Sequence, residues 1–294
     1  MNKNEWLAER FEANRGHMKA VAYRMLGSMG EAEDAVQESW LRLSRADTTA
    51  VENLEGWLTT VVARVCLDML RSRKVRREEL LGGHPSDPVA VDEDGVDPEE
   101  ETLLAESVGL ALLVVLERLT PAERLAFVLH DVFAVPFEEI GSIVGRSPSA
   151  ARQMASRARR RVRGTTTVSD GDLSQQREVV EAFLAALRAR DFEGVLAVLD
   201  PDVVRRADRA AVPSEAAREI RGAAMVAREA LAHTDRAQFA RPALVNGSVG
   251  ILVAPRGRLF MALRCTVRGG RIVEMEVIAD PERLRQIDLG VLGE

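Results

Sequence analysis

Apolar residues recur at helical spacing along the first eighty residues of the chain. Between positions 54 and 65 they stand three, four, seven and eleven residues after Leu54, which places them on one face of an α-helix. Polar and charged residues occupy the positions between them. The pattern predicts a helical domain over residues 1–80.

The composition then changes. Residues 81–101 contain the pair Gly82-Gly83, three prolines, and eight acidic residues from Asp87 onward without a Lys or Arg, which is typical of an acidic linker. Helical spacing resumes near Thr102, and Thr120-Pro121 combines a helix N-cap with a first-turn proline. The sequence therefore predicts a second helical domain over residues 102–164, followed by a short linker over residues 165–173.

The end of this second domain has the pattern of a helix-turn-helix. Phe137, Ile140 and Val144 are spaced as on one helix face, and Gly145 supplies a break. Ser147-Pro148 then provides an N-cap and a first-turn proline for the next helix. Two short helices joined by a tight turn are expected.

Charge on the second of these helices points to DNA. The chain has a net charge of -6, yet residues 146–163 hold seven arginines and no acidic residue. In a helix-turn-helix the start of the second helix enters the major groove and later residues contact phosphates. A solvated basic helix that binds nothing is the alternative. The side chains that the DNA interpretation selects are Ser149, Arg152, Gln153, Ser156, Arg157 and Arg160.

From residue 174 to residue 294 the pattern indicates an α+β domain. Helical spacing over 176–199 and 214–233 is followed by four apolar runs, at 239–245, 249–254, 259–267 and 272–278. Asn246-Gly247 and Gly269-Gly270 lie between runs and are hairpin signals. We expect helices first and an antiparallel sheet after them.

Composition excludes several classes of protein. The only cysteines, Cys66 and Cys265, lie far apart inside apolar patterns, so we expect buried thiols and neither a disulfide scaffold nor a zinc cluster. No signal-peptide pattern and no apolar run of about 20 residues is present, which favours a cytoplasmic protein without a membrane partner. No glycine-rich phosphate loop or clustered metal-ligand motif occurs, so no cofactor and no metal are expected.

The order of helical domain, acidic linker and helix-turn-helix resembles the extracytoplasmic function (ECF) class of bacterial sigma factors, within the sigma-70 family. Residues 22–43 resemble the core of region two, residues 54–71 the helix that melts and reads the promoter, and residues 119–162 region four. The resemblance implies a multidomain fold with an all-α N-terminal half.

This resemblance also implies binding surfaces. Asp34, Gln37 and Glu38 would dock on the clamp helices of the RNA polymerase β′ subunit, and region four would meet the β flap. An ordinary solvated helix face is the alternative for these three residues. Promoter minus-10 recognition is expected near the end of the long helix, with the candidates Arg64, Arg71, Arg73, Lys74 and Arg76.

The tail resembles a SnoaL-like domain of the nuclear-transport-factor-2-like superfamily, which implies a cone of helices and a curved sheet around a pocket. A group of ECF sigma factors carries such a fused domain, with an Asp-Gly-Gly-Gly motif and an Asn-Pro-Asp-Lys-Leu-like motif. The first is reduced here to Asp208, and the second corresponds to residues 280–284. The acidic linker lacks the tryptophan-proline motif that this group of sigma factors carries. The regulatory residues that the resemblance implies are Asp208, Asp280, Pro281 and Leu284.

The sequence thus predicts an alternative sigma factor that binds RNA polymerase core, recognises minus-10 and minus-35 promoter elements and initiates transcription, with its C-terminal domain modulating activity. It is expected to catalyse no reaction. Two alternatives stay open: a ligand-sensing one-component regulator, or a SnoaL-like enzyme fused to DNA-binding domains, which would use Asp208 and His233. Whether the tail binds a small ligand is also left open.

Overall fold

The computed structural model describes residues 3–46, 53–80, 109–166, 168–212 and 217–293. The chain forms two units, one of residues 1–108 with 116–159 and the other of residues 109–115 with 160–294. The predicted acidic linker, 81–101, lies outside the described residues. Helices from both predicted N-terminal domains share the first unit, so the domain boundaries deduced from the sequence stay predictions.

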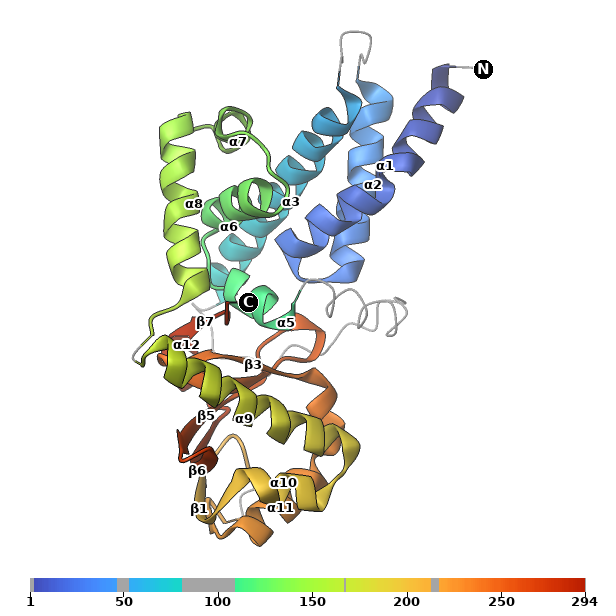
Figure 1. The fold of residues 1–294 in the computed structure, drawn as a ribbon. Helices are drawn as coiled ribbons and strands as arrows, with labels where there is room; N and C mark the ends of the chain where they lie inside the picture. The colour runs from blue at the N-terminus through green and yellow to red at the C-terminus, as the bar shows by residue number, and fades with distance from the viewer. Residues whose placement is uncertain (1–2, 47–52, 81–108, 167, 213–216, 294) are drawn as a thin grey trace. The chain divides into compact units, whose positions relative to one another are not determined.

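Three long helices make up the first part of the first unit (Figure 1). Gly27, in the left-handed region with φ of 74°, ends the first helix, and Ser28 caps the second. Met18, Tyr23 and Leu58 are fully buried in the core between them. The helices are α1 (Lys3–Leu26), α2 (Met29–Arg45) and α3 (Leu54–Leu80).

Short helices follow, and local signals fix their ends. Thr120 and Glu123 form a reciprocal capping box, in which each side chain accepts a hydrogen bond from the other residue's backbone N–H at 3.3 Å. The predicted helix-turn-helix is confirmed: Gly145 turns the chain with φ of 73°, and the Ala150 N–H donates to Ser147 Oγ at 3.3 Å. The elements are α5 (Leu110–Leu116), α6 (Pro121–Phe127), the π-helical turn η1 (Val128–Val132), α7 (Phe137–Val144) and α8 (Pro148–Arg163).

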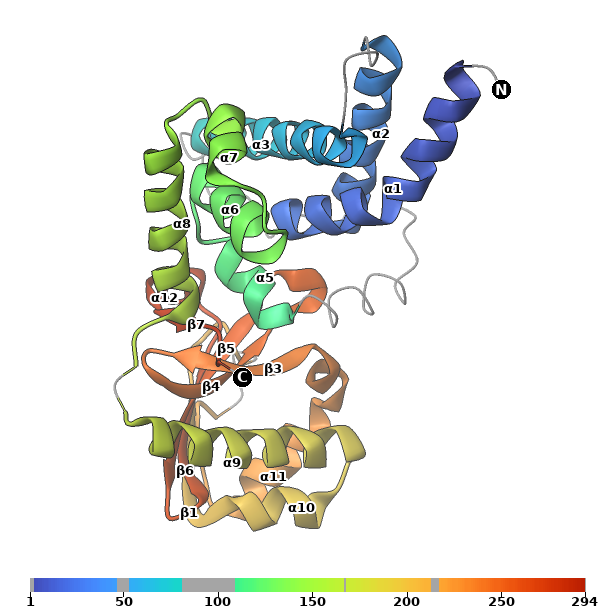
Figure 2. The ribbon, with the colours of Figure 1, turned by 45° about the horizontal axis from the view of Figure 1, so that its top comes forward.

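In the second unit, helices pack against a sheet whose seven strands run in the order β2-β1-β6-β5-β4-β3-β7 (Figure 2). This architecture confirms the predicted α+β class. The helices are α9 (Asp170–Ala189), α10 (Phe192–Val198), α11 (Ala223–Ala232) and α12 (Pro281–Gln286), with 3-10 turns η2 (Thr234–Phe239) and η3 (Pro255–Gly257). The strands are β1 (Leu199–Ala207), β2 (Glu219–Arg221), β3 (Ala240–Val245), β4 (Ser248–Val253), β5 (Met261–Arg268), β6 (Arg271–Ile278) and β7 (Leu289–Gly290).

Both hairpin signals are confirmed. Asn246 and Gly247 have φ of 50° and 85° between β3 and β4, and Gly269 and Gly270 have φ of 56° and 74° between β5 and β6. Positive φ at both central residues is the two-residue turn whose twist matches that of paired strands. The four apolar runs therefore form the consecutive antiparallel strands β3 to β6.

The expectation of helices followed by a purely antiparallel sheet is wrong in one respect. Strand β1 precedes α11 and pairs in parallel with β6, with Val204 opposite Glu274. Its sequence contains Pro201 and several charged residues, so it lacks the alternation that marks a strand. Residues 219–221 likewise form β2 where a helix was predicted, because they pair with β1.

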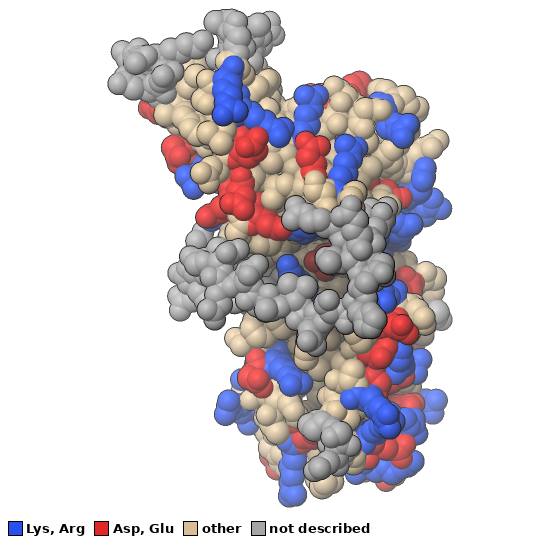
Figure 3. Space-filling view, turned by 180° about the vertical axis from the view of Figure 1, so that it is seen from behind, with Lys and Arg blue, Asp and Glu red and all other residues tan. Residues whose placement is uncertain are grey.

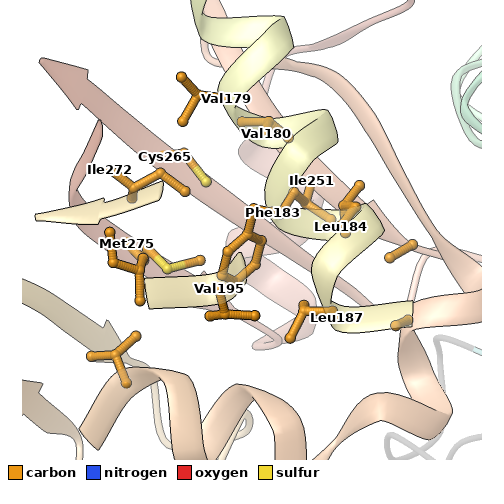
Figure 4. Close-up of a cluster of buried hydrophobic side chains, with 14 of the residues drawn as sticks. Val179, Val180, Phe183, Leu184, Leu187, Val195, Ile251, Cys265, Ile272 and Met275 are labelled. Atoms are coloured by element: carbon orange, nitrogen blue, oxygen red, sulfur yellow. The ribbon is translucent and has the colours of Figure 1, made fainter. Parts of the chain in front are cut away.

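The core of the second unit lies between α9, α10 and the sheet (Figure 4). Phe183 of α9, Val195 of α10 and Met275 of β6 are each at most 2% exposed. Cys265 of β5 belongs to the same cluster, and Cys66 is buried in α3. The prediction of buried, unpaired cysteines is therefore confirmed.

Burial makes these thiols a probe of folding. Desolvation raises the pKa of Cys66 and of Cys265 from 9.0 to about 12. We predict that iodoacetamide at pH 8 alkylates neither thiol in the folded protein and both in urea, as mass spectrometry would show. Because the unfolded thiols ionise first, this contribution to the free energy of unfolding should fall as pH rises from about 9 toward 12. Rapid alkylation of the folded chain would contradict the assignment.

Candidate nucleic-acid interface

Helix α8 has one apolar face and one polar face. Ala151, Ala155 and Ala158 are completely buried. The residues selected for DNA contact are all exposed, and their spacing places them on the other side of the helix. The small alanine side chains let α8 pack closely while a basic and amide surface faces outward. This surface, the reading face, consists of Ser149, Arg152, Gln153, Ser156, Arg157 and Arg160.

Two contacts fix α8 on its neighbours. The Arg152 guanidinium lies over the ring of Phe137 on α7, 5.1 Å from its centroid, in a cation-π contact. Arg159 forms an ion pair with Asp131 in η1. Arg159 therefore orients the helix, whereas Arg157 and Arg160 are exposed.

The minus-10 candidates on α3 separate into two groups. Arg64 and Arg71 are exposed and two helical turns apart, so they share a face. Arg73 is instead half-buried in an ion pair with Glu31 of α2, and its Nη1 donates to the backbone oxygen of Leu26 at 3.2 Å. The side chains of Lys74 and Arg76 lie outside the described part of the structure. Arg73 thus joins three helices where the sequence suggested a DNA contact.

The proposed docking face of α2 contains a residue that the sequence analysis did not select. Asp34 and Gln37 are exposed, and Glu38 accepts from Arg42 Nε at 2.9 Å. Leu41, four residues after Gln37 on the same face, is 40% exposed, so an apolar side chain stands among polar ones. Single exposed apolar residues are common on protein surfaces, so the sequence alone carried no signal that would have selected Leu41.

Arg124 of α6 is buried against the first helices. Its side chain is 3% exposed, and its Nε donates to the backbone oxygen of Arg24, near the end of α1, at 3.0 Å. Desolvation lowers the pKa of Arg124 to about 10, although the Glu117 carboxylate opposes the shift. The guanidinium thus stays charged at neutral pH and satisfies a helix-end carbonyl. Helix α6 and the end of α1 are therefore in direct contact here.

In the second unit, the two sequence motifs of the tail meet. Asp208 accepts three backbone N–H groups, from Ala211 at 3.0 Å, from Ala279 at 3.0 Å and from Asp280 at 2.9 Å. Asp280 in turn caps α12 by accepting the N–H groups of Glu282 and Arg283. A carboxylate whose oxygens accept this many backbone donors has a structural role.

The other residues of the second motif complete the start of α12. Pro281 occupies its first turn, where the missing N–H costs nothing, and Leu284 is buried.

On the face shown in Figure 3, basic and acidic side chains are interspersed over the second unit. Within the second unit, Arg206 forms an ion pair with Glu219 at 2.9 Å. The described residues contain no group of three His, Cys, Asp or Glu side chains placed to hold a metal. None of the described helices has the length and apolar character needed to cross a bilayer.

Known proteins match this organisation. The family model for sigma-70 region 2 matches residues 10–76, and that for sigma-70 region 4 matches residues 109–162. The chain is 42% identical to the ECF RNA polymerase sigma factor SigJ of Mycobacterium tuberculosis, over 93% of this chain and 91% of the relative. It is 33% identical to the probable ECF RNA polymerase sigma factor SigI of the same species, over 97% of each. The crystal structure of SigJ has 38% identity and a TM-score of 0.45, covering 94% of this chain and 98% of that one.

The matched regions coincide with the helices that bear the docking face and the reading face. The chain therefore belongs to the family of extracytoplasmic function RNA polymerase sigma factors. Similarity extends through the C-terminal unit, because the SigJ and SigI matches cover nearly the whole chain.

The structural role of Asp208 can be tested by Asp208→Asn. An amide places an NH2 group against at least one backbone donor, so we predict a loss of about 1–3 kcal/mol in the free energy of unfolding. Urea denaturation would measure it. Asp202→Asn, at an exposed position on β1, the strand that Asp208 follows, is the matched control and should change stability little. Equal losses for the two variants would refute the hydrogen-bonding argument.

Proposed function

We propose that this chain acts as an alternative sigma factor, which binds RNA polymerase core, recognises minus-10 and minus-35 promoter elements and initiates transcription. The observation that carries the proposal is the separation of exposed basic residues onto two helices, α3 and α8, together with an acidic and amide face on α2. A sigma factor needs all three surfaces, because it must bind the enzyme and two DNA elements at once.

The reading face of α8 is the proposed minus-35 contact. Gln153 can form paired hydrogen bonds with adenine, and an exposed arginine such as Arg157 can do so with guanine or contact phosphate. Arg160, further along the helix, suits a phosphate contact. The contact of Arg152 with Phe137 holds that guanidinium at the edge of the same face.

The proposed minus-10 contact is the exposed face of α3 with Arg64 and Arg71, extended by Lys74 and Arg76. Positive charge near the C-terminus of a helix is favoured by its dipole and is attracted to the phosphate backbone. Arg73 contributes indirectly, because its ion pair with Glu31 fixes α3 against α2. In this proposal, the exposed residues Arg64 and Arg71 contact the DNA.

The proposed polymerase contact is the α2 face formed by Asp34, Gln37, Glu38 and Leu41. Polar groups around a central apolar side chain match the usual arrangement of a protein interface, which has an apolar centre and a polar rim. We place the β′ clamp helices opposite this face and the β flap opposite the region-four helices. Acidic groups on α2 favour basic groups on the polymerase surface.

Promoter binding requires the two halves of the first unit to separate. Elements named for positions -10 and -35 are about 25 base pairs, or roughly 85 Å, apart along DNA at 3.4 Å per pair. Helix α3, with 27 residues, spans only about 40 Å, and α6 packs against it. The contact of Arg124 with the backbone oxygen of Arg24 therefore belongs to a closed form that polymerase binding must open.

The C-terminal domain is proposed to modulate this activity through the end of α8. Residues 160–164 cluster with the second unit. The Val291 N–H, after β7, donates to the backbone oxygen of Val162 at 2.7 Å. A Cβ on Gly290 would lie 2.7 Å from Gly164 Cα, so the two backbones are closely packed. Because α12, capped by Asp280, leads directly into β7, rearrangement of the Asp208–Asp280 cluster would alter the support of the recognition helix.

Core binding can be tested by Asp34→Lys and Leu41→Ala. Each should weaken the affinity for purified RNA polymerase core by about tenfold, since one reverses a complementary charge and the other removes a buried anchor. Fluorescence anisotropy of labelled protein would measure the dissociation constants. The control is Glu12→Lys, an equal charge change at an exposed position on α1. Unchanged affinity for both test variants would remove the α2 face as the docking site.

Promoter recognition can be tested by Arg157→Ala in run-off transcription with core polymerase, on a promoter first mapped with the unmodified holoenzyme. Loss of one groove contact should reduce output by about tenfold or more. Scrambling the minus-35 element should give a similar decrease and make the variant indistinguishable from the parent. Arg228→Ala removes the same charge from an exposed position on α11 and should have no effect. Full output from Arg157→Ala would contradict the assignment of the reading face.

A further inference from the structure

The second unit contains a cavity of about 430 Å³ that the proposed function does not use. It extends the core between α9, α11 and the sheet. Apolar side chains form most of its wall, among them Phe183 and Leu187 of α9, Ile251 of β4 and Met275 of β6. Figure 4 shows these four side chains within the buried cluster. The volume lies within the range of about 300–1,000 Å³ that small-molecule sites occupy.

Such a cavity favours an occupant other than water. The cavity is partly open to solvent, so a small molecule can enter it. An ordered water needs two to four polar partners, and the apolar part of the wall, around Phe183, Ile251 and Met275, does not provide them. A ligand with a large apolar body would restore the missing contacts.

One wall of the cavity is polar. Arg205 of β1, which is 4% exposed, donates through Nε to Glu229 Oε2 of α11 at 2.8 Å and pairs with the other carboxylate oxygen through Nη2. The guanidinium charge is thereby neutralised by a bidentate partner. The carboxylate oxygens retain lone pairs that can accept further hydrogen bonds. This wall therefore presents an acceptor without a net charge.

His233 adds a second acceptor next to Glu229. Its Nδ1 lies 3.0 Å from the backbone oxygen of Glu229, and a carbonyl oxygen can only accept, so Nδ1 carries the proton. In the neutral ring Nε2 then has a free lone pair. The remaining cation at the cavity, Arg236, lies over the ring of Phe260 at 5.4 Å.

We propose that this cavity binds an uncharged, predominantly apolar molecule with a hydroxyl group, which donates to Glu229 or to His233 Nε2 while its apolar body contacts α9 and the sheet. Two acceptors and a neutralised ion pair disfavour a carboxylate ligand, and the apolar walls disfavour a sugar or a nucleotide. Binding needs neither polymerase nor DNA, so its failure would leave the sigma-factor proposal untouched.

The test uses the full-length chain and N-phenyl-1-naphthylamine, an uncharged probe whose fluorescence rises in apolar sites. Naphthalene, 2-naphthol and 2-naphthoate would compete for the probe at pH 7.5. They share an apolar body and differ only in the polar group. We expect 2-naphthol to displace the probe at a concentration at least about tenfold lower than either of the others.

Matched variants locate the site. Ala230→Trp fills the cavity from α11 and should abolish probe binding, whereas Ala224→Trp, at an exposed position of the same helix, should leave it intact. His233→Phe removes one acceptor and should reduce the preference for 2-naphthol over naphthalene by at least about threefold. It is exposed, so this variant keeps the test valid if Ala230→Trp fails to fold.

The proposal is overturned by any of three results: no saturable probe binding, probe binding that Ala230→Trp leaves unchanged in a folded protein, or a preference for 2-naphthoate or naphthalene over 2-naphthol. The last result would show an apolar or anion-selective cavity. Loss of the hydroxyl preference in His233→Phe, with retained naphthalene affinity, supports the assigned donor-acceptor contact.

Discussion

The helical unit depends on a buried cation. The guanidinium of Arg124 lies where α6 meets the end of α1, and its Nε donates to the backbone oxygen of Arg24. The last carbonyls of a helix lack partners within it and carry partial negative charge, so a cation is favourable there. Burial nevertheless costs energy, as the lowered pKa of about 10 reflects. Water would solvate the Arg124 guanidinium well once it is exposed. The contact between α6 and α1 is therefore suited to an interface that opens.

Arginine has three different roles in this chain, and exposure and pairing distinguish them. Arg64 and Arg157 are exposed on helix faces and can meet nucleic acid. Arg73 and Arg159 form ion pairs with acids on neighbouring elements and so orient helices. Arg205 is buried in the second unit and paired with Glu229, where it neutralises one wall of a cavity. Net charge alone would have treated these residues alike, although their exposure and their partners differ.

In the C-terminal unit, the carboxylate of Asp208 connects the loop after β1 with the residues that precede α12. Asp208 binds the backbone that leads into α12, and the strand after α12 meets the backbone of Val162 at the end of α8. The cavity is lined in part by Arg205 and Ala207 of β1, the strand that Asp208 follows. The hydrogen bonds of Asp208 therefore connect the end of the cavity-lining strand β1 with the residues that lead into α12.

The sequence by itself determined the structures whose signals lie within a few residues of one another. The capping box at Thr120, the turn at Gly145 and the two hairpin turns follow from local backbone preferences and short-range hydrogen bonds. Only the tertiary structure decided the parallel pairing of β1 with β6, the ion pair of Arg73 and the burial of Arg124. Arg73 and Arg124 bond to carbonyls 47 and 100 residues away, and Asp208 to an N–H 72 residues away. No local pattern encodes such a partner, because folding brings it near only after the helices and strands have packed.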